Sequence, residues 1–246
     1  MKILFINFQS GMRMTNSHIQ YITSGWKYIL PHNSDALEDV VKFINKEKPD
    51  IVSFAEIDDC SFRTKQCNQV GVISQKTHLE HFIFFPTRVS GTWINQGNAI
   101  LSKYPIANSN QEQLPGRGEK RYLCSTDIFV DKNKLRFYTT HLSTTKKRNI
   151  MQREFIASKM QQVQVPAILT GDFNIGTREM QIIKHKTNFK DIKFENTFPS
   201  WKPKMILDHI FVSKEFNVQQ SKTYIEEKFS DHLPIGIVSK FNDKED

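Results

Sequence analysis

Seven short apolar runs, separated by polar segments, limit the possible folds of this 246-residue chain more than any other feature. Several are rich in β-branched or aromatic residues, as buried strands are. None approaches the roughly 18 apolar residues that a membrane-spanning helix needs, so we expect no stable membrane insertion. The runs predict strands at residues 3–6, 51–54, 82–85, 135–139, 167–169, 206–212 and 233–238.

One pair of strands has the pattern of a hairpin. Segments 123–130 and 135–140 flank a polar turn at residues 131–134. Other strands are separated by segments long enough to hold a crossover helix. Hairpin-linked and crossover-linked strands together predict an α/β protein with mixed sheets.

Two segments have the spacing of amphipathic helices. The first begins after Asp35, which we expect to act as the N-cap, with Glu38 three residues further on. Its apolar residues fall at i, i+3, i+4 and i+7: Leu37, Val40, Val41 and Ile44. The second helix is expected from about Lys146 to Gln164, before Pro166. Its apolar stripe consists of Met151, Phe155, Ile156, Met160 and Val163.

The chain contains nothing that resembles a linker, a repeat or a low-complexity tract, so residues 1–246 predict one continuous domain. The N-terminal residues have no long apolar core or cleavage site and are typical of a first strand rather than a signal peptide. Three cysteines, an odd number without zinc-site spacing, favour reduced thiols. A cytoplasmic location is therefore expected.

The charge balance permits a polyanionic partner without identifying one. The 34 Lys and Arg residues outnumber the 26 Asp and Glu residues, which gives a net charge of +8. The basic residues are scattered, so charge alone favours an ordinary solvated surface.

Polar residues stand at six of the boundaries between strands and loops. Each one taken singly is explained by the preference of acidic and amide residues for turns. Six such positions, two with His beside Asp, indicate an active site at one edge of the sheets, where catalytic loops gather in layered α/β folds. The residues are Asn7, Glu56, His141, Asp172, Asn174, Asp208, Asp231 and His232.

These residue types suit the hydrolysis of phosphate esters. A hard cation held by carboxylates neutralises the charge of a phosphodiester and polarises its phosphoryl oxygen. The four acidic residues of the set supply oxygen ligands or orient their neighbours, and the two asparagines add neutral oxygens or amide donors. Because the set is rich in oxygen and lacks cysteine, Mg²⁺ or Mn²⁺ is expected.

Histidines are the natural proton-transfer groups of such a site, because imidazole titrates near neutrality. His141 and His232 are assigned this role. Asp208 is assigned to fix the tautomer of His232. His209 competes with His232, but it lies in mid-strand and alternates away from Asp208, so a packing role is expected for it.

Six segments together resemble the ordered motifs of the endonuclease/exonuclease/phosphatase superfamily, and the match extends from Asn7 to His232. Its members include pancreatic-type deoxyribonucleases, AP endonucleases, neutral sphingomyelinases, deadenylases and inositol polyphosphate 5-phosphatases. The Gly-Asp-Phe-Asn and Ser-Asp-His motifs are specific in combination. The segments are PDIVSFAEID, QGNAILSKYPI, FYTTHLS, ILTGDFNI, FPSWKPKMILDHIFVS and FSDHLPI.

The resemblance implies a four-layer α/β sandwich in which two mixed β-sheets pack face to face and helices flank them. It also implies that Glu56 is the principal magnesium ligand, helped by Asn7, and that Asp231 lies next to the metal.

The same resemblance implies the catalytic roles. Asp172 aligns the attacking water, and Asn174 stabilises the phosphoryl transition state. Asp208 orients His232, which acts as a general base or contacts the phosphate. His141 binds the phosphate or protonates the leaving oxygen, and it replaces the tyrosine usual in AP endonucleases.

Other positions either fit or depart from the family pattern. Gln9 fits it, whereas Ala55 stands where the family often has glutamine. Asn98 is a candidate substrate contact, with a structural amide as the alternative. Arg121, in the basic loop 117–121, is a second candidate, with a solvated loop as the alternative.

The sequence therefore predicts an Mg²⁺- or Mn²⁺-dependent phosphodiesterase, most of all a monomeric nuclease acting on DNA or RNA, because the basic charge balance suits backbone phosphates. We expect little sequence preference and no special activity at abasic sites. The alternative substrates are a phospholipid, sphingomyelin or an inositol phosphate. An inactive binding module is disfavoured because none of the eight positions is lost.

Overall fold

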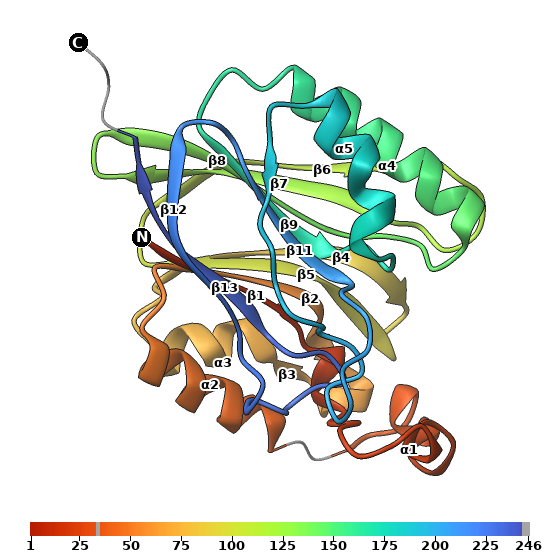
Figure 1. Ribbon diagram of the computed structural model, residues 1–246. Coiled ribbons are helices and arrows are strands. Elements are labelled where there is room, and N and C mark those ends of the chain that lie inside the picture. Colours follow the sequence, from red (N-terminus) through yellow and green to blue (C-terminus); the bar gives the residue numbers. More distant parts are fainter. Residues whose placement is uncertain (33–34, 243–246) are drawn as a thin grey trace.

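The computed structural model describes residues 1–32 and 35–242, which form two β-sheets packed face to face (Figure 1). The first sheet has seven strands in the order β12-β13-β1-β2-β5-β4, with β3 paired to β2. Its strands are β1 (Lys2–Asn7), β2 (Ile51–Ser61), β3 (Cys67–Asn68), β4 (His81–Ser90), β5 (Ile94–Ser102), β12 (Phe216–Thr223) and β13 (Ile235–Phe241).

The second sheet has six strands in the order β10-β11-β9-β8-β7-β6. Each sheet contains one parallel pair, β1 with β2 and β8 with β9, and its other pairs are antiparallel, so both sheets are mixed. The strands are β6 (Ile106–Gln113), β7 (Tyr122–Val130), β8 (Asn133–His141), β9 (Ala167–Asp172), β10 (Lys190–Asp191) and β11 (Asp208–Val212).

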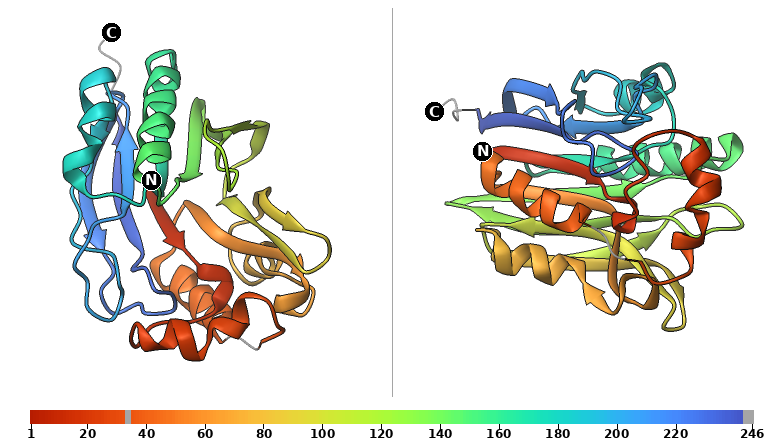
Figure 2. Two further views of the ribbon diagram at one scale, coloured as in Figure 1. Left: turned by 90° about the vertical axis from the view of Figure 1, so that its right-hand side faces the viewer. Right: turned by 90° about the horizontal axis from the view of Figure 1, so that it is seen from below.

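Helices cover the outer faces of the two sheets, which completes the four predicted layers (Figure 2). α2 (Ala36–Glu47) and α3 (Gln69–Lys76) pack on the seven-stranded sheet, and α4 (Lys146–Gln161) and α5 (Gln181–Lys186) pack on the six-stranded one. The remaining helical elements are short: η1 (Gln9–Gly11), α1 (Ile19–Thr23), η2 (Gly25–Tyr28), η3 (Phe62–Thr64) and η4 (Thr177–Met180).

Successive side chains of the central strands point to opposite faces of each sheet, and in this way they contribute to three apolar layers. In β1, Ile3 and Phe5 face the core between the sheets, while Leu4 and Ile6 face α2 and α3. β9 behaves in the same way, because Ile168 points between the sheets and Leu169 points toward α4 and α5. Strands buried on both faces are continuous apolar runs, which is why the sequence predicted them.

The predicted hairpin is β7–β8, and its turn uses Asp131 in the left-handed region at φ 54°. Strands β5, β6 and β12 were not predicted. β6 and β12 are edge strands, and many of their side chains are polar and exposed. β5 contains Asn, Gln and Gly within its first half. Polar strands of this kind carry little hydrophobic signal.

The two predicted helices are α2 and α4, but their details differ from the prediction. Asp35 is at the N-cap of α2, yet its side chain makes no capping hydrogen bond. In α4 the side chain of Met151 is 41% exposed, so the predicted apolar stripe was wrong there. The first turns of α4 instead bury Asn149, Gln152 and Arg153, whose side chains bond to neighbouring loops.

Among the residues that the structure describes, no helix is both long enough and apolar enough to cross a membrane.

Candidate active site

The ends of four strands from the two sheets meet at one place. β1 ends at Asn7 and β9 ends at Asp172, and the Asn7 amide Nδ2 donates a 2.9 Å hydrogen bond to Asp172 Oδ2. Parallel pairing puts the end of β8, His141, directly beside Asp172. Antiparallel pairing puts Asp208, the first residue of β11, on its other side. Topology therefore gathers residues that are far apart in the sequence.

Asp172 is the hub of this arrangement. Its Oδ1 accepts a 2.8 Å hydrogen bond from the backbone amide of Asn174, and its Oδ2 lies 3.6 Å from His141 Nε2 and 3.8 Å from His232 Nε2. Burial, with a further contribution from the Asp208 charge, raises the pKa of Asp172 to about 7. A raised pKa favours the protonated form of this carboxyl group.

The loop after β9 is held tightly from several sides. Gly171 is required, because a Cβ there would lie 2.5 Å from the carbonyl oxygen of Thr140. The amide of Asn149, on α4, donates a 2.7 Å hydrogen bond to the Phe173 carbonyl. The Asn174 amide Nδ2 donates to the carbonyl of Leu142 at 2.9 Å. These contacts hold the backbone of the Gly-Asp-Phe-Asn motif in place and so fix the position of the Asp172 side chain.

His232 and Asp208 form a buried dyad, in which His232 Nδ1 lies 2.8 Å from Asp208 Oδ2. Burial alone lowers the pKa of His232, but the carboxylates of Asp208 and Asp172 outweigh burial and raise it well above its ordinary value. The ring of Phe198 packs 4.8 Å away and restricts the imidazole further. The other oxygen of Asp208, Oδ1, is buried without a hydrogen-bond partner in the described part of the protein.

Glu56 is placed by an irregularity in β2, whose register with β5 shifts between Phe54 and Ile57. Its backbone is in the left-handed region at φ 53°, a strained conformation that tends to occur at functional sites. Its Oε1 lies 3.7 Å from His141 Nδ1, and burial, together with the Asp231 charge, raises its pKa. A quarter of its side chain remains exposed, so Glu56 is reachable from solvent.

His141 lies between two carboxyl groups and is itself buried. Burial, followed by the charges of Arg121 and His232, lowers its pKa well below the ordinary value. A neutral imidazole both donates and accepts hydrogen bonds, so His141 is suited to contact a substrate oxygen.

Asp231 accepts hydrogen bonds from three side chains, one of which, Tyr21, was not indicated by the sequence motifs. Its Oδ2 accepts from Gln9 Nε2 at 2.9 Å and from the Tyr21 hydroxyl at 2.6 Å, and its Oδ1 accepts from the Ser230 hydroxyl at 3.1 Å. Tyr21 comes from α1, a short helix that carries no motif, so no sequence signal pointed to it.

The two candidate substrate contacts lie in different surroundings. Asn98, in β5, is buried, and its amide makes a weak 3.9 Å contact with Cys124 Sγ. Arg121 pairs with Glu119 at 2.9 Å, and its Nε is buried without a partner among the described residues. Its charge contributes to the lowered pKa of His141.

His209 lies outside this group. It is buried, its Nδ1 lies 3.3 Å from Asp191 Oδ1, and its ring packs edge-on at 5.6 Å from Phe173. It points away from the dyad because it follows Asp208 in a strand.

A buried ion pair behind the site was also not predicted. Arg63 is fully buried and donates from Nε and Nη2 to the two oxygens of Asp58, both at 2.7 Å. Its Nη2 also donates to the Ser10 hydroxyl, which accepts as well from Gln96. Gln96 then reaches Glu56 Oε2 at 3.4 Å, which connects this network to the site.

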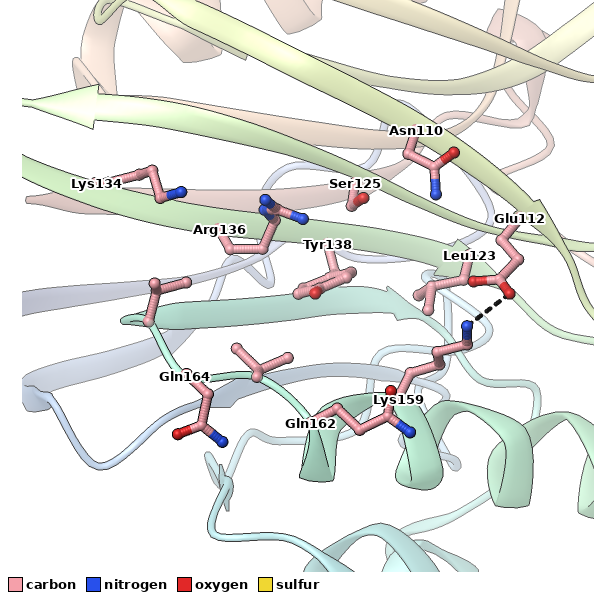
Figure 3. Close-up of a pocket in the computed structure, with 12 residues that line it drawn as sticks. Asn110, Glu112, Leu123, Ser125, Lys134, Arg136, Tyr138, Lys159, Gln162 and Gln164 are labelled. Atoms are coloured by element: carbon pink, nitrogen blue, oxygen red, sulfur yellow. Dashed lines mark ion pairs between the residues drawn. The ribbon is translucent and has the colours of Figure 1, made fainter.

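A separate cavity of about 320 Å³ lies on the outer face of the six-stranded sheet (Figure 3). Its cationic side chains are already paired, Lys159 with Glu112 at 2.7 Å and Arg136 with Asp127. Arg136 alternates with the core residue Phe137, so the cavity opens on the face opposite to the core. Its lining contains none of the eight candidate active-site residues.

The residues at the strand ends fit a divalent cation. Ligand atoms of Asp172, Asp208 and His232 lie within 4.8 Å of one another, in a buried cluster that is compatible with a metal site. Two buried oxygens, Asp208 Oδ1 and Gln9 Oε1, have no hydrogen-bond partner among the described residues and are hard donors of the kind that Mg²⁺ prefers. Several carboxylates gathered with few cations also indicate a missing positive charge.

The family model described as "Endonuclease/Exonuclease/phosphatase family" matches residues 17–232, most of the chain. The chain belongs to this family. It is a hydrolase acting on phosphoric ester bonds. A search of curated proteins found no match.

Solved structures show the same fold at low sequence identity. A family protein from Leptotrichia buccalis C-1013-b has 19% identity and a TM-score of 0.73, and the match covers 98% of this chain and 100% of that one. A mannosyl-6-phosphatase from Bacteroides thetaiotaomicron has 16% identity, coverage of 98% and 100%, and a TM-score of 0.71. D. rerio TDP2, complexed with a single-strand DNA product, has 15% identity, coverage of 98% and 98%, and a TM-score of 0.72.

Proposed function

We propose that this family member hydrolyses phosphodiester bonds with the help of Mg²⁺ or Mn²⁺. The observation that carries the proposal is the position of Asp172. This carboxyl group with a raised pKa lies within 4 Å of His141 and His232, while Asp208 fixes the far side of the His232 ring.

The cation would be held by Glu56 and the Asn7 side-chain oxygen, with Asp231 beside it. When bound, it supplies Lewis-acid polarisation of the phosphoryl oxygen and offsets the charge of the diester. Tyr21 and Gln9 hold the Asp231 carboxylate in one orientation. The oxygen-only donors of these three residues exclude a cysteine-type zinc site.

Asp172 and the residues around it carry out the proton-transfer steps and stabilise the transition state. Asp172 orients the attacking water and accepts its proton. His232, held by Asp208, has a raised pKa that favours its charged form, which suits it to stabilise the charge of the phosphoryl oxygens. His141, which is neutral, donates a hydrogen bond toward the leaving oxygen, and the Asn174 side chain supports the same transition state.

Nucleic acid is the first candidate substrate. The net charge of +8 supports contacts to several backbone phosphates. Among the described residues, the Nε of Arg121 is buried without a partner and its charge acts on His141, so Arg121 is the first proposed phosphate contact. Asn98 is the second proposed substrate contact. The structural neighbour D. rerio TDP2 was solved with a single-strand DNA product, which supports nucleic acid as a candidate.

A phospholipid or another lipid-linked phosphodiester is the second candidate. The observation in its favour is a group of exposed aliphatic side chains in residues 19–30, next to the site. Nucleic acid has little apolar surface against which such side chains could be buried.

A substrate panel with Mg²⁺ or Mn²⁺ tests the proposal. Plasmid DNA, single-stranded DNA, RNA, sphingomyelin, phospholipid and inositol phosphates are each incubated with the wild-type protein and with Asp172→Ala. We expect metal-dependent cleavage of at least one phosphodiester by the wild type alone. Turnover that survives thorough metal stripping, or no turnover of any ester, would reject the proposed chemistry.

A further inference from the structure

Five large apolar side chains are exposed together in residues 19–30, which we call the 19–30 surface. Neither helical element of the segment, α1 or η2, contains a buried residue. Soluble proteins rarely expose so many neighbouring aliphatic groups without using them in binding. The exposed fractions are 67% for Ile19, 85% for Ile22, 49% for Trp26, 58% for Ile29 and 48% for Leu30.

The 19–30 surface is attached to the active site. The Tyr21 hydroxyl donates a 2.6 Å hydrogen bond to Asp231, and the Tyr28 hydroxyl accepts a 3.3 Å hydrogen bond from Gln9. In Figure 1, α1 projects beyond the end of β1, and β1 ends at Asn7, which donates a hydrogen bond to Asp172. Whatever binds this surface is therefore held next to the predicted catalytic centre.

Further apolar groups extend the surface toward the β4–β5 hairpin. The Arg63 guanidinium donates to the Tyr28 carbonyl at 3.1 Å, and the Arg63 carbonyl accepts from the His32 amide at 3.0 Å. Phe62, the neighbour of Arg63, packs against Trp93 with ring centroids 4.7 Å apart. These two rings are 38% and 50% exposed, so they add to the exposed apolar area.

Positive side chains flank the surface on the side of the loop 196–206. Neither this loop nor residues 1–34 contain an Asp or Glu. The loop packs against α1 through Trp201, whose ring lies 5.2 Å from that of His18, the N-cap of α1, and 6.2 Å from that of Tyr21. It carries Lys202 and Lys204, which are exposed and form no ion pair within residues 1–32 and 35–242. These two lysines offer positive charge to an anionic ligand on this side of the surface.

An anionic lipid surface matches both properties. Ile and Leu side chains gain by entering the acyl region, Trp and Tyr suit the interface, and lysines pair with lipid phosphates. The phosphates of single-stranded nucleic acid would pair with the lysines, but its bases bind by stacking on aromatic rings rather than by contact with aliphatic groups. We infer that the 19–30 surface docks on an anionic phospholipid surface and presents the active site to phosphodiesters held there.

This inference rests on the proposed phosphodiesterase function, and the test separates the two. Full-length protein in chelator, where metal-dependent turnover is suppressed, is sedimented with vesicles of phosphatidylcholine and phosphatidylglycerol in equal parts. The variants are Ile22→Ser, whose side chain has few protein contacts, and Ile22→Ser combined with Trp26→Ser. The matched control is Phe129→Ser, which removes a 41% exposed ring near the β7–β8 turn, at the far end of β8 from His141.

We expect the wild type and Phe129→Ser to sediment equally with these vesicles. The double variant should partition at least about tenfold less, the scale expected when large apolar side chains no longer leave water. Ile22→Ser should lie between. Turnover of the soluble diester bis(p-nitrophenyl) phosphate with Mn²⁺ should be the same for the wild type and all three variants.

Two results would overturn the inference. Either the wild type fails to sediment with the vesicles, or the double variant sediments as well as the wild type. A wild type that binds vesicles and hydrolyses no soluble or vesicle-borne diester leaves the docking surface standing and rejects the proposed phosphodiesterase function.

Discussion

His232 Nδ1 lies 2.8 Å from the carboxylate oxygen Oδ2 of Asp208, and both side chains are buried. The contact fixes the ring so that the opposite nitrogen, Nε2, points toward Asp172 at 3.8 Å. A carboxylate that accepts a hydrogen bond from an imidazole in this way keeps the ring in one orientation and stabilises its positive charge.

Replacement of His232 by alanine should lower turnover by about 10²-fold or more, the range for loss of a positioned proton-transfer or charge-stabilising group. Asp208→Asn should be milder if Asp208 only orients the ring. The matched control is His209→Ala, which should leave turnover nearly unchanged and lower the melting temperature, because His209 packs on Phe173. Steady-state rates and thermal melts of the three variants check this. A large rate loss in His209→Ala with a normal His232→Ala would refute the assignment.

The sequence predicted most of the strands that form the centres of the two sheets, because each contains a run of apolar residues that is buried, on both faces in β1 and β9 and mainly on the core face in β8. It also predicted residues that lie together at the strand ends, since polar residues after apolar runs are visible in the sequence. The edge strand β12 and the shift in β2 that places Glu56 were not visible, because they depend on pairing with distant strands. Tyr21 was missed for a similar reason, since only the folded chain brings α1 to Asp231.

Replacement of Asp172 by alanine should also lower turnover by about 10²-fold or more, because the water-aligning carboxyl group is lost. The lesion should appear in kcat rather than in substrate affinity, since Asp172 is buried behind the two histidines. Asp191→Ala is a suitable control, because this buried carboxylate contacts His209 and Lys184 outside the site. A raised KM with an unchanged kcat for Asp172→Ala would contradict the proposed role.

Replacement of Glu56 by alanine should weaken cation binding, so that activity falls most at low metal concentration and is partly rescued by excess Mg²⁺ or Mn²⁺. Activity is measured as a function of metal concentration after chelator treatment. Glu227→Ala, which removes a carboxylate paired with Lys46, is the control and should leave the metal dependence unchanged. A Glu56→Ala protein with the wild-type metal dependence would show that the cation is held elsewhere.

Cation binding should stabilise the protein more at pH 8 than at pH 5. The pKa of Asp172 in the folded protein, about 7, exceeds its unfolded value of 3.8, so this group takes up a proton on folding. Its contribution to the metal-free protein is present below about pH 4 and is lost as the pH rises through about 7. The raised pKa of Glu56 acts in the same direction. A cation competes with these protons and replaces them once the carboxyl groups ionise.

Thermal unfolding with and without Mg²⁺ or Mn²⁺ at both pH values measures this linkage. The metal-induced rise in melting temperature should be larger at pH 8. Asp172→Asn, which cannot ionise, should reduce the difference between the two pH values. An equal or larger rise at pH 5 would mean that the buried carboxyl groups are not those neutralised by the cation.

Replacement of Arg63 by methionine should destabilise the protein by about 3–5 kcal/mol, because removal of one partner leaves the charge of a buried pair uncompensated. Arg63 has no exposed side-chain surface, and Asp58, which accepts two of its hydrogen bonds, is equally buried. Arg63 also holds the Tyr28 carbonyl and the Ser10 hydroxyl, so its loss should loosen the segment that carries Tyr21.

Chemical denaturation of Arg63→Met measures the loss, and Lys46→Met, at an exposed ion pair with Glu227, should show no measurable change. Because methionine leaves the Asp58 carboxylate unpaired, the second substitution Asp58→Leu should recover part of the lost stability by removing that charge. A single variant with wild-type stability, or a double variant less stable than the single one, would show that the pair is not needed to neutralise a buried charge. Recovery of stability without recovery of activity would place Arg63 among the residues that position η1 and α1 around Asp231.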